Sequence, residues 1–167
     1  MSEPMTTGLP AHLVFPLQQA ATADYTTGQR AFGSNRRGGR KHAGCDLYAP
    51  VGSSVVAMAA GTIIQPVYAF YLGTFALEVD HGTFVARYGE IKQEHADQFA
   101  TGDDVLPGQL LGSVGQLQGL SFSMLHLELY TGSASGGLTD RANPPYQRRA
   151  DLMNPTPFVD RAAQSLS

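Results

Sequence analysis

The chain has 167 residues, of which 43% are hydrophobic and 15% charged, and its formal net charge is −3. This length and composition suit one folded domain with a substantial core and exclude a disordered chain. The negative charge gives no reason to expect nucleic acid as a partner, and no apolar run is long enough to span a membrane. Nineteen glycines and ten prolines indicate many turns, as in an all-β protein, and the single cysteine cannot form an internal disulfide.

The amino-terminal segment, residues 1–11, is expected to be a loose polar start. Met1 to Pro4 has neither the basic region nor the apolar region of a secretory signal peptide, so no such signal is predicted. The short apolar run over residues 12–17 is expected to be a strand or an extended segment at the edge of the domain.

A glycine-rich segment, residues 30–41, carries much of the chain's positive charge. Two interpretations are open: a solvated loop, or a cationic rim that attracts an anionic substrate to a groove. Five of the eleven basic side chains lie here, namely Arg30, Arg36, Arg37, Arg40 and Lys41.

Directly after this segment, His42 and Asp46 offer imidazole and carboxylate, two ligand types that zinc takes. Four residues of a straight strand advance roughly 13 Å, which is too far for easy sharing of one ion. A helix is disfavoured by Gly44 and Pro50. We therefore expect an extended segment bent at Gly44, where the missing Cβ permits unusual backbone angles. His42 and Asp46 would then converge, with Cys45 on the opposite face as a small core residue.

Between residues 51 and 115 short apolar runs alternate with turn residues, a pattern typical of antiparallel strands. Asp80-His81-Gly82 separates two runs as a hairpin turn would, so His81 is interpreted as a turn residue rather than a catalytic one. Residues 92–102 suit a short helix or a loop. The expected strands are 55–59, 62–68, 74–79 and 83–88, with turn, strand and turn over 106–115.

The segment 124–130 shows the clearest strand pattern in the chain. Three leucines alternate with polar positions, so His126 and Glu128 should share the face opposite the leucines. His126 would look into a groove. Glu128 is either a support for a metal ligand or a solvated side chain.

After Gly132 the composition changes to glycine, serine, asparagine and proline. We predict one domain over residues 1–167, with its core over about 13–131 and residues 132–167 as an extended tail that wraps it. The fold class predicted from these patterns is all-β.

The ordered series of motifs resembles the lysostaphin-type zinc metallopeptidases, the M23 family, which cut peptide cross-bridges of bacterial cell walls. The resemblance implies an antiparallel β-sheet sandwich with a groove that holds the metal, and few short helices. It runs from about Phe15 to Tyr130 and rests on Phe32-Gly33, His42 to Leu47, Ala49 to Gly52, Val56-Ala57, Ala60-Gly61, Val79 to Gly82, Arg87-Tyr88, Val105 to Gly108, Gly112, Gly115 and Leu125 to Glu128.

This resemblance implies that His42, Asp46 and His126 bind Zn²⁺. The two further histidines of the family have no counterpart: Met124 stands at the first histidine of the H-x-H motif and Glu90 at that of Y-x-H. Glu90 is our candidate general base, since glutamate takes that role in H-E-x-x-H metalloproteases. Met124 cannot donate a hydrogen bond to an oxyanion, and loss of one such donor typically costs about 10²–10³ in rate. Arg87 or His81 are candidates to replace that donor.

The resemblance therefore predicts a zinc-dependent endopeptidase that hydrolyses peptide bonds in bacterial peptidoglycan. Two alternatives remain. One is a catalytically degenerate domain that binds peptidoglycan or has a regulatory role, and the other is a structural β-domain without bound metal. A wall hydrolase acts at the cell wall or periplasm. Without a classical signal peptide we expect export by other delivery machinery, such as a phage lysis or tail system or a contact-dependent secretion machine, and an inhibitor protein is a further possible partner.

Overall fold

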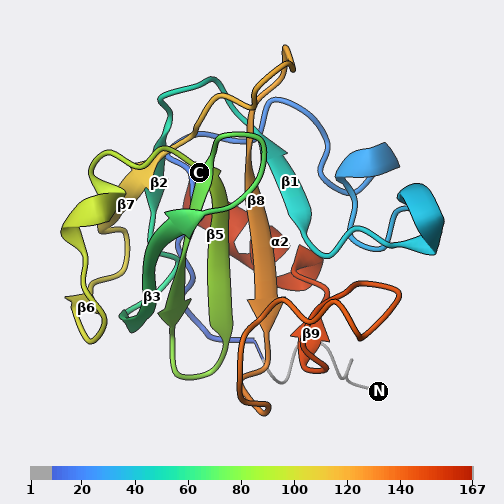
Figure 1. Cartoon of the computed structure of the whole chain (residues 1–167). Coiled ribbons are helices and arrows are strands. Elements are labelled where there is room, and N and C mark those ends of the chain that lie inside the picture. The colour runs from blue at the N-terminus through green and yellow to red at the C-terminus, as the bar shows by residue number, and fades with distance from the viewer. Residues whose placement is uncertain (1–8, 167) are drawn as a thin grey trace, which may run out of the picture.

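Two antiparallel sheets make up the body of the protein, as a computed structural model shows (Figure 1). The structure describes residues 9–166, so most of the predicted polar start lies outside the described residues. Within that range the larger sheet has the order β1-β8-β5-β4-β3-β6, with β9 beside β8, and the smaller sheet pairs β2 with β7. The strands are β1 (Cys45–Tyr48), β2 (Ser54–Val56), β3 (Gly61–Ala69), β4 (Phe75–Asp80), β5 (Val85–Ile91), β6 (Asp104–Val105), β7 (Leu110–Ser113), β8 (Met124–Tyr130) and β9 (Leu152–Met153).

The helical elements are few and short, as expected. Among the described residues, one α-helix, α2 (Thr156–Ala163), is accompanied by the 3-10 turns η1 (Gly28–Arg30), η2 (Arg37–Gly39), η3 (Ala96–Gln98) and η4 (Gln164–Leu166). None of the helices in residues 9–166 combines the length and the apolar character that crossing a bilayer requires. The predicted all-β class is confirmed.

The alternation predicted for residues 124–130 is confirmed by burial. Leu125, Leu127 and Leu129 of β8 are fully buried in the main hydrophobic cluster, together with Cys45 and Leu47 of the neighbouring β1. Because side chains of a strand alternate between its faces, the other face of β8 carries His126 and Glu128. One side of the large sheet therefore forms the core and the other is available for a site.

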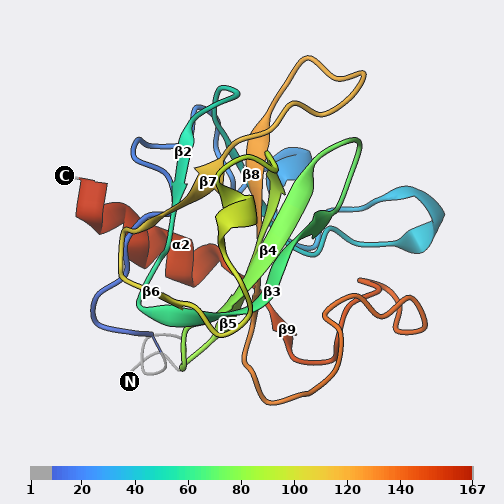
Figure 2. The ribbon, with the colours of Figure 1, turned by 60° about the vertical axis from the view of Figure 1, so that its left-hand side comes forward.

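The carboxy-terminal segment differs from the predicted extended tail because it contains α2. Phe158, Val159 and Ala162 are buried in the same cluster as Phe15 near the other end of the chain. Figures 1 and 2 show α2 on the side of the sheet away from the loops around η1 and η2. The apolar spacing that buries one helix face covers only one and a half turns, which is too short to indicate a helix among glycines and prolines.

Candidate metal centre

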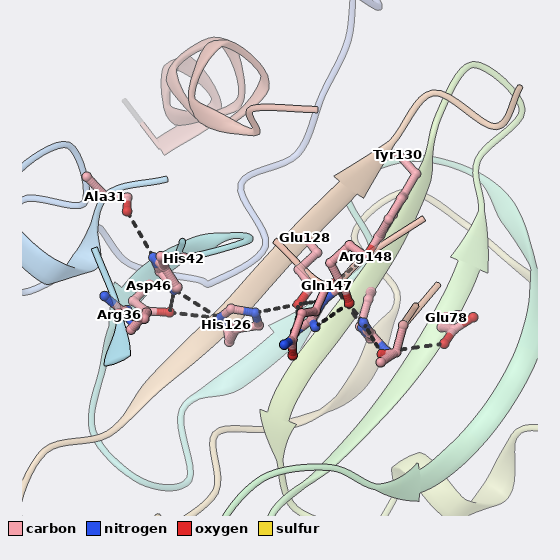
Figure 3. Close-up of polar contacts among 12 residues, drawn as sticks. Ala31, Arg36, His42, Asp46, Glu78, His126, Glu128, Tyr130, Gln147 and Arg148 are labelled. Carbon is pink, nitrogen blue, oxygen red and sulfur yellow. Dashed lines mark hydrogen bonds and ion pairs between the residues drawn. The ribbon is translucent and has the colours of Figure 1, made fainter. Parts of the chain in front are cut away.

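The structure brings the three predicted metal ligands together on the open face of the large sheet (Figure 3). Asp46 of β1 lies directly opposite His126 of β8 in the strand register. Asp46 Oδ1 is 2.9 Å from His126 Nδ1 and 3.1 Å from His42 Nε2. One ligand atom from each residue lies within 4.8 Å of the other two, and all three residues are buried.

Gly44 bends the chain between His42 and Asp46, as predicted, but for a different reason. Its φ is not among the positive values found at other glycines, so left-handed backbone angles are not what the position requires. A Cβ built on Gly44 would lie 2.4 Å from the carbonyl oxygen of Leu127. Glycine is needed here because β8 passes too close for any side chain.

Hydrogen bonds fix which nitrogen of each histidine faces the cluster. His42 Nδ1 is 2.9 Å from the carbonyl oxygen of Ala31, to which it donates, so Nε2 is left for a metal. His126 Nε2 lies 2.7 Å from Glu128 Oε2, which leaves Nδ1. Backbone and carboxylate partners of this kind set the tautomer and ring orientation of metal-binding histidines.

In the absence of a metal, the Asp46 carboxylate and the His126 imidazolium stabilise each other's charged forms. Burial alone would raise the pKa of Asp46, but hydrogen bonds and charge from His126 and His42 outweigh burial and hold this pKa at about 2. Burial would lower the pKa of His126, yet its hydrogen bonds to Asp46 and Glu128 raise that pKa to about 10. A metal must displace the proton on Nδ1, so metal affinity should increase with pH.

Glu128 is the support of His126 and not a solvated side chain, since it is fully buried. Arg87 donates to its Oε1 at 2.9 and 3.1 Å, and Tyr130 donates to the same oxygen at 2.5 Å. Arg148, from the segment predicted as a tail, donates to both carboxylate oxygens at 3.0–3.1 Å. Although burial opposes ionisation, Arg87, His126 and Arg148 keep the pKa of Glu128 well below its ordinary value. Sequence patterns gave no signal for Arg148.

Glu90 lies in a β-bulge that turns its side chain to the open face. On β4, Phe75 pairs with Ile91 and Ala76 with Gly89, so Glu90 is the extra residue of β5. Its φ of 64° is in the left-handed region, which is uncommon for a residue other than glycine. Without the bulge, Glu90 would share the core face with Tyr88.

The Glu90 carboxyl is buried, and its Oε1 has no hydrogen-bond partner among residues 9–166. Burial raises the pKa of Glu90 to about 7; the charge of His126 opposes this shift, while those of Asp46 and Glu128 add to it. An unsatisfied buried carboxyl costs stability, and such groups gather at functional sites.

Comparisons with known proteins assign the family. The model of peptidase family M23 matches residues 40–138, which is more than half of the chain. The chain belongs to peptidase family M23. The matched residues include the whole His–Asp–His cluster and Glu90. No curated protein sequence matches the chain.

Solved structures share the fold. The antimicrobial peptidase lysostaphin from Staphylococcus simulans is 19% identical, with a TM-score of 0.66 over 92% of this chain and 56% of that one. A mutant catalytic domain of the prophage-encoded M23 protein EnpA from Enterococcus faecalis is 24% identical, with a TM-score of 0.55 over 90% and 96%. A zinc-containing peptidase from Vibrio cholerae is 22% identical, with a TM-score of 0.52 over 68% and 36%. The chain spans only 49%, 51% and 56% of three of the structures it matches, two of them lysostaphin.

Met124 and Arg87 line the groove, whereas His81 does not. Met124 is buried, pairs with Tyr48 across β1 and β8, and lines the groove. His81 lies outside the groove lining and bonds to the Tyr88 hydroxyl at 2.8 Å and to the Ala60 carbonyl at 3.1 Å, so it cannot replace a missing donor. Arg87 lines the groove, but its guanidinium is engaged with Glu128.

Proposed function

We propose that this protein is a zinc-dependent endopeptidase that hydrolyses peptide bonds in bacterial cell-wall peptidoglycan. The observation that carries the proposal is the cluster of His42, Asp46 and His126, whose ligand atoms lie within 4.8 Å of one another in the groove of an M23 domain. Peptidases of this family are metal-dependent.

The residues present fit a zinc ion. Two imidazole nitrogens and one carboxylate oxygen are ligands that zinc accepts, and a set of three leaves a fourth position open, as in catalytic sites. Both histidines are oriented by partners on their other nitrogen, which metal sites require. When bound there, zinc would supply a water acidified to a pKa of about 7 and a Lewis acid for the scissile carbonyl.

Glu90 is proposed as the general base, in the place of the histidine that follows the family tyrosine. Its carboxylate would take the proton of the attacking water and pass it to the nitrogen of the leaving amine. Two features support this role: an Oε1 without a hydrogen-bond partner among residues 9–166, and a pKa near neutrality, where a group both accepts and returns a proton efficiently. Met124 offers no hydrogen-bond donor, so the rate should be lower than in a site with a histidine there.

The proposal is tested by incubating the zinc-loaded protein with sacculi and separating the released muropeptides. New peptide ends should appear with the wild type and be lost with Glu90→Gln, while Glu94→Gln, which changes an exposed acid four residues further along the chain and outside the groove lining, should cut normally. Equal cutting by Glu90→Gln would refute the assigned base. If sacculi retain the wild type but release no peptides, the domain binds without turnover.

The same function places the site of action at the cell wall or periplasm. Fractionation of the producing cells, followed by immunodetection, checks this location. Protein confined to the cytoplasm throughout growth and lysis would contradict it.

A further inference from the structure

The groove above the His–Asp–His cluster is strongly cationic, although the chain as a whole is acidic. It is a cavity of about 530 Å³. Of the eleven basic residues of the chain, more than half line this cavity, against two acids, Asp46 and Glu90. The basic lining residues are Arg36, Arg40, Lys41, Arg87, Arg141 and Arg148.

Most of these cations come from two loops that are joined to each other. The backbone N–H of Lys41 donates to the carbonyl of Pro145 at 2.9 Å, and the rings of Phe32 and Tyr146 stack with their centroids 5.1 Å apart. In Figures 1 and 2 the loop that carries η2 and the orange-red loop before β9 both lie on the side of the sheet away from α2. Together they form a cationic wall.

The facing part of the groove is aromatic and apolar. It comes from the tip of the β3–β4 hairpin and from residues 117–122, which are joined by a 2.9 Å hydrogen bond from the Gln118 N–H to the Leu72 carbonyl. Tyr71 and Phe122 in this wall are 53% and 42% exposed. Positive charge is therefore concentrated on one side of the cavity.

Three cations of the groove, Arg36, Arg87 and Arg148, already have a carboxylate partner, and the other three have none within residues 9–166. Arg87 and Arg148 are both paired with Glu128. Within the described part of the chain, the Lys41 ammonium donates only to a neutral partner, Asn35 Oδ1, at 3.3 Å. The side chains of Arg40 and Arg141 are exposed and form no hydrogen bond or ion pair within residues 9–166.

We propose that Arg40, Lys41 and Arg141 select peptide substrates that carry free carboxylates beside the scissile bond. This inference rests on the proposed peptidase function and adds the charge of the substrate. Guanidinium groups bind carboxylates through paired hydrogen bonds, which a carboxamide at the same position cannot match. A cationic wall also raises the local concentration of an anionic peptide and its association rate.

The test uses two synthetic peptides of one sequence, one with free carboxylates and one with carboxamides, and compares kcat/KM for each. Arg40→Gln and Arg141→Gln should each lower kcat/KM for the acidic peptide about twofold to fivefold, and the double variant about tenfold, with little change for the amidated peptide. Arg37→Gln is the matched control, because Arg37 is exposed in the same loop but does not line the groove. Added salt should reduce cleavage of the acidic peptide selectively.

The outcomes separate this inference from the function on which it rests. If neither peptide is cut, the peptidase proposal fails, and fluorescence anisotropy of the two labelled peptides still measures selection by charge. If both peptides are cut and bound equally well, the inference is overturned. It is also overturned if Arg37→Gln lowers kcat/KM as much as Arg141→Gln, because net charge alone would then explain the effect.

Discussion

Replacing Glu90 with glutamine should stabilise the metal-free protein against unfolding, and this stabilisation should be larger at pH 8 than at pH 5. The same change should abolish the proposed hydrolytic activity. The carboxyl is buried beside Asp46 and Glu128, and its Oε1 has no hydrogen-bond partner within residues 9–166. Ionised Glu90 therefore destabilises the fold. Glutamine has nearly the same shape and cannot ionise.

The size of the effect follows from the pKa of Glu90, which is 4.5 for a free side chain and about 7 in the folded protein. Because the folded pKa is the higher one, the folded state binds more protons between these values, and stability falls as pH rises through this window. Above pH 7 the full difference is about 3 kcal/mol, of which roughly 2.5 kcal/mol is lost between pH 5 and pH 8.

The assay is urea unfolding of both proteins with a chelator present, at half-unit steps from pH 5 to pH 8. His126 also titrates above pH 6.5 because its folded pKa is raised to about 10, so the wild-type curve alone mixes two groups. The difference between wild type and Glu90→Gln isolates Glu90. A difference that stays constant across this range would refute the argument that burial controls this carboxyl.

Three further predictions concern the metal and the chain around it. His126→Ala should reduce the zinc retained after dialysis from close to one ion per chain to a small fraction, as measured by mass spectrometry of the metal, whereas His12→Ala, an exposed histidine, should retain it. Glu128→Gln should weaken zinc binding about 10- to 100-fold in competition with a chromophoric chelator, because the histidine loses its orienting carboxylate; unchanged affinity would contradict that role. Gly44→Ala should lower the free energy of unfolding by about 1–3 kcal/mol, since the new methyl group meets a backbone oxygen of β8, whereas Gly137→Ala, where a Cβ meets only ordinary contact, should change it little in the same denaturation assay.

Features that depend on local spacing could be predicted from the amino-acid sequence alone. The leucines at every second position of residues 124–130 bury one face of a strand, so His126 and Glu128 must share the other face. A glycine between His42 and Asp46 allowed only a bent, extended segment, and that bend is present. Residue types and short-range periodicity therefore sufficed for most of the strands, though not for the two-residue strands β6 and β9, and for the convergence of two ligands.

Features that depend on which distant segments meet could not be predicted in this way. Strand parity alone places Glu90 in the core; the bulge that turns it into the groove exists because three residues of β5 oppose two of β4, and that register is a property of the pair. Arg148 reaches Glu128 only because the chain after β8 returns to the open face of the sheet before α2 crosses to the other. Register and loop return are set by packing between distant segments, and no local pattern in the sequence encodes them.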